Sequence, residues 1–165
     1  KNNKNILVSY LKTNIYYLKA GDEFYIDKMY FKVLWPSSNQ LDVNNNSLVI
    51  YSVLFNTRFL FTGDIEKEAE YKLIKEIGKI EVDVLKVAHH GSKTSSTEIF
   101  LNSVKFKYAV SMNGYKNTFG FPHSSVVKRI NSIENVYMFN TLECGTITFY
   151  RNNKRKDLKI SMSYK

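Results

Sequence analysis

The chain has 165 residues, of which 44% are hydrophobic, so it is long and apolar enough to fold as one domain around a core, and this composition is not typical of a disordered chain. Its net charge of +9, from 24 Lys and Arg against 15 Asp and Glu, favours an anionic partner such as nucleic acid, phosphate or a membrane surface. A single cysteine, Cys144, excludes an internal disulfide and a Cys-x-x-Cys zinc site. No apolar run approaches the roughly 18 residues of a membrane span.

The first part of the chain is expected to form one helix and several strands. The helix is expected over 4–14, where apolar residues share one helical face. Strands are expected where apolar runs are bounded by turn residues: two within 15–27 about a turn at 20–22, then 30–36, 47–55 and 58–63. The last two strands are expected to form a hairpin about Asn56 and Thr57.

The segment 64–78 carries the clearest helical pattern. Its apolar residues recur at every fourth position and form one face: Ile65, Ala69, Leu73 and Ile77. Glu66 and Glu68 lie in the expected first turn, where the helix dipole favours negative charge, and Gly78 is a typical glycine at a helix C-terminus.

The rest of the chain alternates strands with helices. Strands are expected over 82–88, 107–112, 136–139, 145–150 and 158–162. One helix is expected near 96–104, with Ser95 and Glu98 as a capping box, and another from about Ser124. This alternation predicts a layered α/β or α+β domain.

Polar residues follow two of these strands. Asp64 follows the strand 58–63, and His89 and His90 follow the strand 82–88. If the helix between them is a crossover connection, the two strands are parallel and their carboxyl ends share one edge of the sheet. An aspartate and a histidine brought together at that edge are typical ligands of zinc, manganese or iron.

Both halves of this candidate site have structural alternatives. Asp64 also fits a helix N-cap, and two histidines also fit a polar strand end. Neighbouring side chains on a strand point to opposite faces, so at most one of His89 and His90 faces a metal unless the chain turns between them. Gly91 makes such a turn easy.

A third histidine, His123, precedes the helix expected at Ser124. It is placed there to contact an anion near the helix N-terminus, or alternatively to pack on Phe121. The segment 44–47 either lines a site with its amides or leads into a strand. The sequence contains neither a Gly-x-Ser-x-Gly elbow nor a Gly-x-x-x-x-Gly-Lys-Ser/Thr phosphate loop.

Taken in order, the motifs resemble one protein family. The chain reads "WPSSN…NNNSLVIYSVLFNTRFLFTGDIEKEAEYKLI…VDVLKVAHHGSKTSSTEIFL…KYAVSMNGYKNTFGFPHSSVVKRI". This order resembles the C-terminal part of the metallo-β-lactamase-type domain in the ComEC/Rec2 DNA-internalisation proteins of bacterial competence. The resemblance covers about 18–150, and "TGD" and "LKVAHHGSKTSS" are its most telling pieces. It implies an αββα sandwich of two similar halves, of which residues 1–165 would be the second.

The resemblance also implies roles for the polar residues. Asp64 would bridge two divalent ions, zinc or manganese. His90 would be the histidine ligand that comes late in the family's sequence, and His89 would contact substrate phosphate or also bind metal. His123 matches a Gly-His-Pro-His-like loop whose first histidine is Phe121 here. The superfamily's His-x-His-x-Asp-His segment has no counterpart in this sequence. The first half of the domain, with the ligands that complete the site, is therefore expected to lie outside this chain, which opens on "KNNKN" without an initiator methionine.

The function implied is that of a metal-dependent hydrolase, a DNA phosphodiesterase, within a bacterial inner-membrane protein of which this chain would be a soluble domain. DNA and the N-terminal half of the same domain are the expected partners. Alone, the chain is expected to be inactive, to bind metal poorly and to form a homodimer, since 48–50 and 84–85 would be only partly covered. Two alternatives stay open: a free-standing hydrolase of another phosphoester, and a non-catalytic module that binds DNA or a protein partner.

Overall fold

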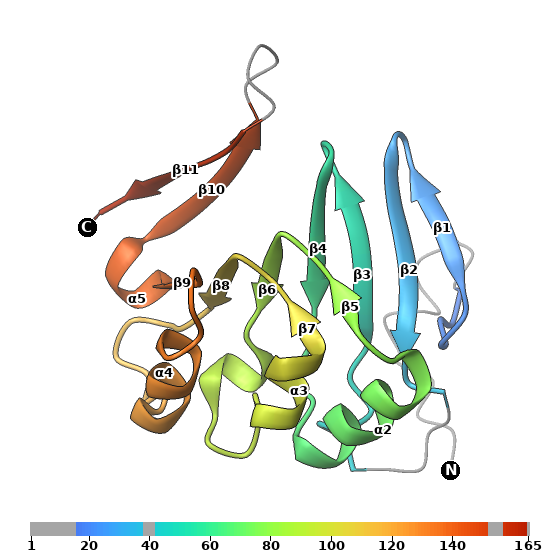
Figure 1. Ribbon diagram of the computed structural model, residues 1–165, viewed down its shortest axis with the longest axis horizontal. Helices are drawn as coiled ribbons and strands as arrows, with labels where there is room; N and C mark the ends of the chain where they lie inside the picture. Colours follow the sequence, from blue (N-terminus) through green and yellow to red (C-terminus); the bar gives the residue numbers. More distant parts are fainter. Residues whose placement is uncertain (1–15, 38–41, 152–156, 165) are drawn as a thin grey trace, which may run out of the picture.

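The computed structural model describes residues 16–37, 42–151 and 157–164. Their main feature is a seven-stranded mixed sheet in the order β1-β2-β3-β4-β6-β8-β9 (Figure 1). The architecture is α+β, as the alternation of strands and helices predicts. The helix expected over 4–14 lies outside the described residues. Within the described ranges, no helix is both long and apolar enough to cross a membrane.

The first four strands form an antiparallel meander: β1 (Glu23–Ile26), β2 (Met29–Trp35), β3 (Val49–Leu54) and β4 (Thr57–Phe61). Of the two strands expected within 15–27, only β1 is present in the described part of that segment. The turn between β3 and β4 is at Phe55 and Asn56, with φ of 47° and 61°. The turn therefore comes one residue earlier than expected. Positive φ at both central residues is typical of the two-residue hairpin turns whose twist matches that of the paired strands.

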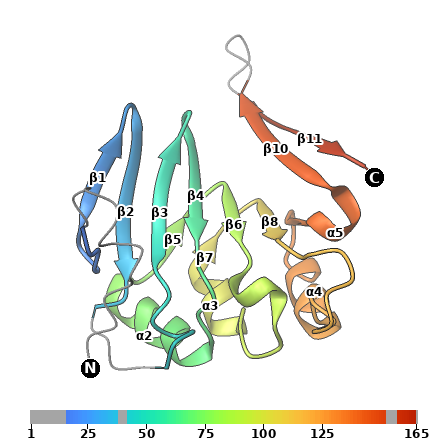
Figure 2. The same ribbon diagram turned by 180° about the vertical axis from the view of Figure 1, so that it is seen from behind.

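The strands that follow β4 in the sheet run parallel to it: β6 (Val84–Lys86), β8 (Tyr108–Ser111) and β9 (Tyr137–Asn140). Helices make the connections: α2 (Lys67–Ile77), α3 (Glu98–Ser103) and α4 (Ser124–Asn131). The short strands β5 (Ile80–Glu81) and β7 (Val104–Lys105) pair with each other beside this layer. Figure 2 shows the helices behind the central strands, so the crossovers lie on one face of the sheet.

The core lies between this face and the helices. Leu60, Leu85 and Ala109 are aligned in register on the three central strands and are fully buried. The helices add Leu73, Phe100 and Ile130 to the same cluster. Burying each large apolar side chain stabilises the fold by about 1.5–3 kcal/mol. This packing fixes the carboxyl ends of β4, β6 and β8 relative to one another.

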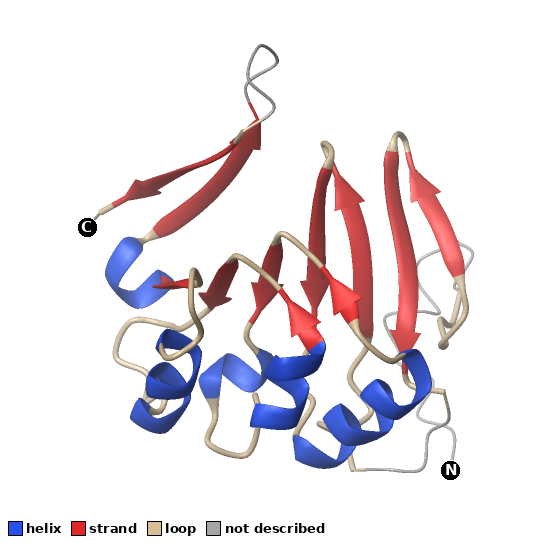
Figure 3. Cartoon of the chain, in the orientation of Figure 1, coloured by secondary structure: helices blue, strands red, loops and turns tan. Residues whose placement is uncertain are grey.

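The opposite face of the sheet is partly covered by a separate ribbon. The ribbon consists of β10 (Thr146–Arg151) and β11 (Leu158–Ser163), and it follows the short helix α5 (Thr141–Cys144). It rises away from the sheet (Figure 3). Its Phe149 contacts Phe59 and Tyr108, with ring centroids 6.0 and 5.8 Å apart.

The expectation that 48–50 and 84–85 are only partly covered is wrong for most of these residues. Val49 and Leu85 face the helical core and are fully buried. Val84 faces the other way, but it lies between Phe59 and Tyr108 in the sheet register and is also buried. Leu48, just before β3, is 38% exposed.

The capping box expected at Ser95 does not form. Ser96 has a φ of 53°, which interrupts a helix at that position. The N-cap of α3 is therefore Thr97, whose hydroxyl accepts a hydrogen bond from Phe100 N at 3.3 Å. Ser95 is buried in the preceding loop instead.

Candidate functional site

The candidate site lies at the carboxyl ends of parallel strands β4, β6 and β8. The predicted parallel pairing of the strands on either side of α2 is confirmed, because Phe59 and Leu60 of β4 pair with Val84 and Leu85 of β6. Asp64 follows β4, and the two histidines follow β6. The topology therefore brings them to one edge, where ligand sites of α/β sheets are usually found.

Asp64 and His90 point at each other across this edge. Asp64 Oδ1 lies 3.5 Å from His90 Nε2, and the two side chains are 40% and 43% exposed. The predicted proximity is confirmed. Both groups are open enough to be reached from outside and close enough to contact one ion.

The other ring nitrogen of His90 shows which lone pair faces Asp64. His90 Nδ1 lies 2.5 Å from the backbone oxygen of Met112. A carbonyl oxygen only accepts hydrogen bonds, so Nδ1 carries a proton, and the second ring nitrogen, Nε2, is the one that faces the carboxylate. Either a proton on Nε2 or a cation between the two groups would make the 3.5 Å contact with Asp64 Oδ1 favourable.

This pair fits a divalent metal in geometry. Zinc binds histidine nitrogen and carboxylate oxygen at about 2.0–2.2 Å, which places two ligands of one tetrahedral ion about 3.3–3.5 Å apart. A metal-binding histidine usually donates its second N–H to a backbone carbonyl or carboxylate, as His90 does to Met112. In the described part of the chain, however, no group of three or more His, Cys, Asp and Glu side chains is placed to hold a metal ion.

Asp64 does not cap α2, so its structural alternative is wrong. The N-cap is Glu66, whose side chain makes no capping hydrogen bond. The amide oxygen of the buried Asn45 accepts hydrogen bonds from Glu66 N and Ala69 N at 2.9 and 3.3 Å. Asn45 therefore neither lines the site nor simply leads into β3: it caps the helix from a distant loop.

The two histidines form the turn themselves. His89 and His90 have φ of 45° and 55°, followed by Gly91 at 82°. These left-handed conformations cost about 1–3 kcal/mol for each non-glycine residue, and they turn the chain between the two side chains. The expectation that adjacent histidines diverge therefore does not apply here, and both line the same cavity.

Hydrogen bonds from two other strand ends hold this turn. His89 N donates to Gly63 O at 3.2 Å. Ser111 Oγ and Asn113 Nδ2 both donate to His90 O, at 3.0 and 2.9 Å. Gly91 packs so closely on Pro122 that a Cβ would lie 2.6 Å from the proline Cβ.

His89 lies between a carboxylate and an aromatic ring. Its Nδ1 is 3.1 Å from Glu66 Oε1, but the two are not aligned as a hydrogen bond, and this buried nitrogen makes none within the described ranges. The Phe121 ring packs against the imidazole at a centroid distance of 5.8 Å. These contacts fix the ring at the wall of the cavity.

Lys86 is a further charged residue near Asp64, outside the motifs that mark the candidate site in the sequence. It belongs to β6, is half-buried, and its Nζ donates to Gly63 O at 3.0 Å. Burial lowers the pKa of Lys86, while the nearby Asp64 carboxylate opposes that effect. A lysine inside the apolar run Val84–Val87 is the sequence signal that marks it.

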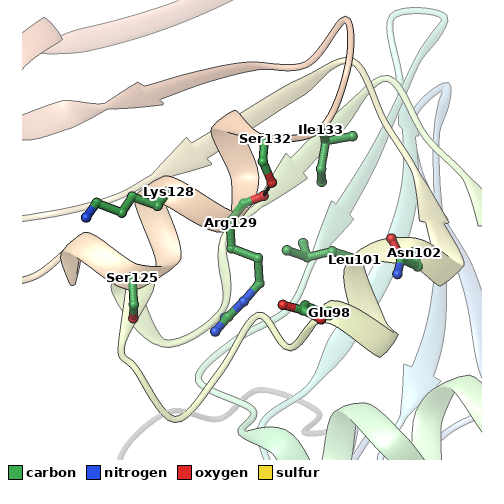
Figure 4. A pocket seen from close by; sticks show the side chains of 8 residues that line it. All are labelled: Glu98, Leu101, Asn102, Ser125, Lys128, Arg129, Ser132 and Ile133. Atoms are coloured by element: carbon green, nitrogen blue, oxygen red, sulfur yellow. Dashed lines mark hydrogen bonds between the residues drawn. The ribbon is translucent and has the colours of Figure 1, made fainter.

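Glu70 fastens the loop that follows the histidines. This fully buried carboxylate accepts hydrogen bonds from Ser96 N and Thr97 N at 2.5 and 2.9 Å. Burial raises the pKa of Glu70, and the two backbone N–H groups oppose the effect. From α4, Arg129 extends into the cleft beside α3 (Figure 4) and donates to Ser96 O at 2.6 Å. No sequence pattern predicts the burial of Glu70, because an acidic residue at this position of a helix normally faces solvent.

His123 has a structural role in α4. It is the N-cap, and its Nδ1 accepts a hydrogen bond from Ser125 N at 3.3 Å and lies 2.8 Å from Ser125 Oγ. Its backbone N donates to Gly91 O at 2.9 Å, which ties the start of α4 to the histidine turn. The expected contact of His123 with an anion stays a prediction.

The site residues line a cavity of about 530 Å³. Its walls include Asp64, His89, His90, Asn113, Phe119 and Phe121. The cavity therefore combines a carboxylate and two imidazoles with an aromatic wall from the loop after β8.

Comparison with known proteins gives no matching family model. The chain is 33% identical over 138 residues to ComE operon protein 3 of Bacillus subtilis, which covers 83% of this chain and 18% of the relative. It is 34% identical over 125 residues to competence protein ComA of Neisseria gonorrhoeae (74% and 18%). It is 35% identical over 130 residues to Recombination protein 2 of Haemophilus influenzae (78% and 16%). The chain thus spans less than a fifth of these relatives, and it is related in sequence to one segment of the ComEC-type competence proteins of bacteria.

Proposed function

We propose that the chain is part of a metal-dependent hydrolase domain of metallo-β-lactamase type, which cleaves phosphodiester bonds of DNA in a ComEC-like DNA-uptake protein. The names of the relatives support the link to competence. The proposal of hydrolytic activity is supported by the geometry of the candidate site. The observation that carries it is that Asp64 Oδ1 and His90 Nε2 face each other at 3.5 Å.

Asp64 and His90 would hold the metal, and Asp64 would bridge two ions in the complete domain. Bound divalent ions supply a nucleophilic hydroxide at neutral pH and stabilise charge on phosphoryl oxygens. The residues around them position the ligands. The bond from His90 to Met112 fixes the imidazole, and Asn113 holds the turn through His90 O. His89, at the cavity wall, would bind metal or donate to a phosphate oxygen.

Two ligands fall short of the three or four protein ligands of a typical zinc site. We infer that the remaining ligands come from the N-terminal half of the same domain, which would pack on the face of the sheet opposite the helices. Stacked aromatic pairs lie on this face and are only partly covered: Phe24 with Phe31, and Phe59 with Phe61. The net charge of +9 is consistent with a DNA substrate.

The test is nuclease activity and metal content measured together on the complete protein that carries this segment. Asp64→Asn is expected to reduce cleavage at least 100-fold and to lower the metal content, because an amide is a poor bridging ligand. DNA affinity should change little, because it comes mainly from phosphate neutralisation by lysines. Asp157→Asn makes the same chemical change at an exposed position beside β11, outside the cavity, and should leave both quantities unchanged.

Two results would contradict the proposal. Undiminished cleavage by the Asp64→Asn protein would exclude a mechanism through this carboxylate. A folded wild-type protein that binds DNA but contains no metal and cleaves nothing in added zinc or manganese would instead identify a non-catalytic binding module.

A further inference from the structure

The loop between β8 and α4 presents an exposed aromatic pair at the candidate site. Phe119 is 77% exposed and stacks on Phe121, with ring centroids 5.5 Å apart and planes at 18°. Both rings line the cavity that contains Asp64 and His90. Single exposed aromatic rings are common on protein surfaces, and Phe55 is also exposed. Phe119 differs from Phe55 because it stacks on a second ring and lines the cavity of the candidate site.

The loop holds the pair in place without burying Phe119. Asn117 Oδ1 accepts a hydrogen bond from Phe121 N at 2.8 Å, and Asn117 Nδ2 donates to Phe121 O at 3.0 Å. On its other side, Phe121 packs against His89. These contacts hold Phe121 in place, and the exposed ring of Phe119 stacks on it beside Asp64 and His90.

The same loop carries further features suited to a polyanion with flat rings. Tyr115 is 70% exposed, and Lys116 Nζ lies 5.5 Å from the centre of its ring. Asp64 is the only acidic residue among those that line the cavity in the described ranges. Aromatic surfaces interleaved with cations are typical of sites for single-stranded nucleic acid, where bases stack on rings and lysines neutralise phosphates.

We propose that Phe119, supported by Phe121, is a stacking platform for an unpaired base of single-stranded DNA and places the neighbouring phosphodiester at Asp64 and His90. The inference rests on the proposed function and deepens it by naming the form of the substrate. In a duplex each base is already stacked on its neighbours, so the platform discriminates in favour of single strands. The alternative occupant of Phe119 is another segment of the parent protein.

The test is binding of a short 2-aminopurine oligonucleotide to the 165-residue chain, measured by fluorescence titration for the single strand and for its duplex. Phe119→Ala is expected to weaken single-strand binding about 5- to 150-fold, the range that corresponds to about 1–3 kcal/mol per stacked base. Duplex binding should change less than twofold. Phe119→Trp preserves a stacking surface and should retain the wild-type single-strand affinity.

Phe55→Ala is the matched control. Phe55 is 85% exposed in the turn between β3 and β4, at the amino end of β4 and thus at the opposite edge of the sheet from the site. It should affect neither ligand. Neither alanine variant should change the thermal unfolding midpoint, since both rings are mostly exposed.

Three outcomes would overturn the inference: no single-strand binding by the wild-type chain, equal affinity of wild type and Phe119→Ala, or an equal loss for single strand and duplex. An equal affinity in the isolated chain, combined with poor folding of the complete protein carrying Phe119→Ala, would show that another protein segment occupies the platform. Because this assay measures binding without cleavage, its outcome is distinct from failure of the Asp64→Asn nuclease test.

Discussion

At the scale of single residues, the candidate site depends on backbone conformations that are normally avoided. His89, His90 and Gly91 all have positive φ, and only the glycine adopts it without steric cost. The strain is compensated by bonds from Gly63, Ser111 and Asn113 to the same turn. Such strain, held by surrounding structure, is common where side chains must be aimed at one point.

Gly91 tests this account of the turn. Gly91→Ala places a Cβ at a φ of 82° and 2.6 Å from the Cβ of Pro122, so we expect the free energy of unfolding to fall by about 1–3 kcal/mol. Urea unfolding of the chain measures the change. Gly114→Ala is the control, because a Cβ there has no heavy atom within 4 Å. Equal stability of the two variants would show that the turn relaxes without cost.

At the scale of elements, α2 positions the loops on both of its sides. Its N-terminus is capped by Asn45 from the loop before β3. Its buried Glu70 holds Ser96 and Thr97, and Lys67 N donates to Thr94 O at 3.0 Å. A crossover helix that simply linked β4 to β6 would need none of these bonds. α2 therefore also fixes the segment that follows the histidines.

Glu70 predicts a specific pH dependence of stability. Because burial raises the pKa of Glu70 above its ordinary value of 4.5, the folded state binds this proton more tightly than the unfolded state does. The contribution of Glu70 to stability is then fully present below pH 4.5 and is lost as pH rises through the raised pKa. We expect the unfolding free energy of wild type minus that of Glu70→Gln to decrease from about pH 4 to about pH 8.

Urea unfolding across that pH range measures this difference, and contributions from the other titrating groups cancel in it. Glu68→Gln, on the exposed side of α2, is the control. The Glu68→Gln difference is the reference against which the pH dependence of the Glu70→Gln difference is judged. A difference for Glu70→Gln that increases with pH would mean that the bonds from Ser96 and Thr97 outweigh burial and lower the pKa instead.

At the scale of the whole molecule, the two faces of the sheet are covered unequally. Helices seal one face around Leu60, Leu85 and Ala109. On the other face, Phe149 of the ribbon packs against Phe59 and Tyr108. Phe24 on β1 and Phe31 on β2 lie further along the same face and are only partly covered.

We therefore expect the isolated chain to form dimers as its concentration rises, because apolar surface on this face is removed from water by pairing. Sedimentation velocity over a wide concentration range measures the association. Phe31→Ser should shift the equilibrium toward monomer. Tyr71→Ser, which removes an exposed aromatic from α2 on the helical side, should not. A strict monomer at the highest concentration would show that the face needs no partner.

The sequence by itself determined much of the architecture. Periodicity located α2 and most strands of the sheet, and the strand–helix–strand order predicted that β4 and β6 are parallel. That prediction was enough to bring Asp64 and His90 to one edge, where their side chains lie 3.5 Å apart. The physical reason is twofold. Apolar periodicity is a local property of the sequence, and the way in which a helix connects two strands follows a small number of general rules.

Only the tertiary structure decided how the site is built in detail. The left-handed turn at His89 and His90, the cap that Asn45 gives to α2, and the burial of Glu70 each depend on bonds between segments more than 20 residues apart. No local pattern marks them, since Asn and Glu in these contexts usually face water. The same is true of Phe119, whose exposure beside Asp64 follows from how one loop folds over the ends of three strands.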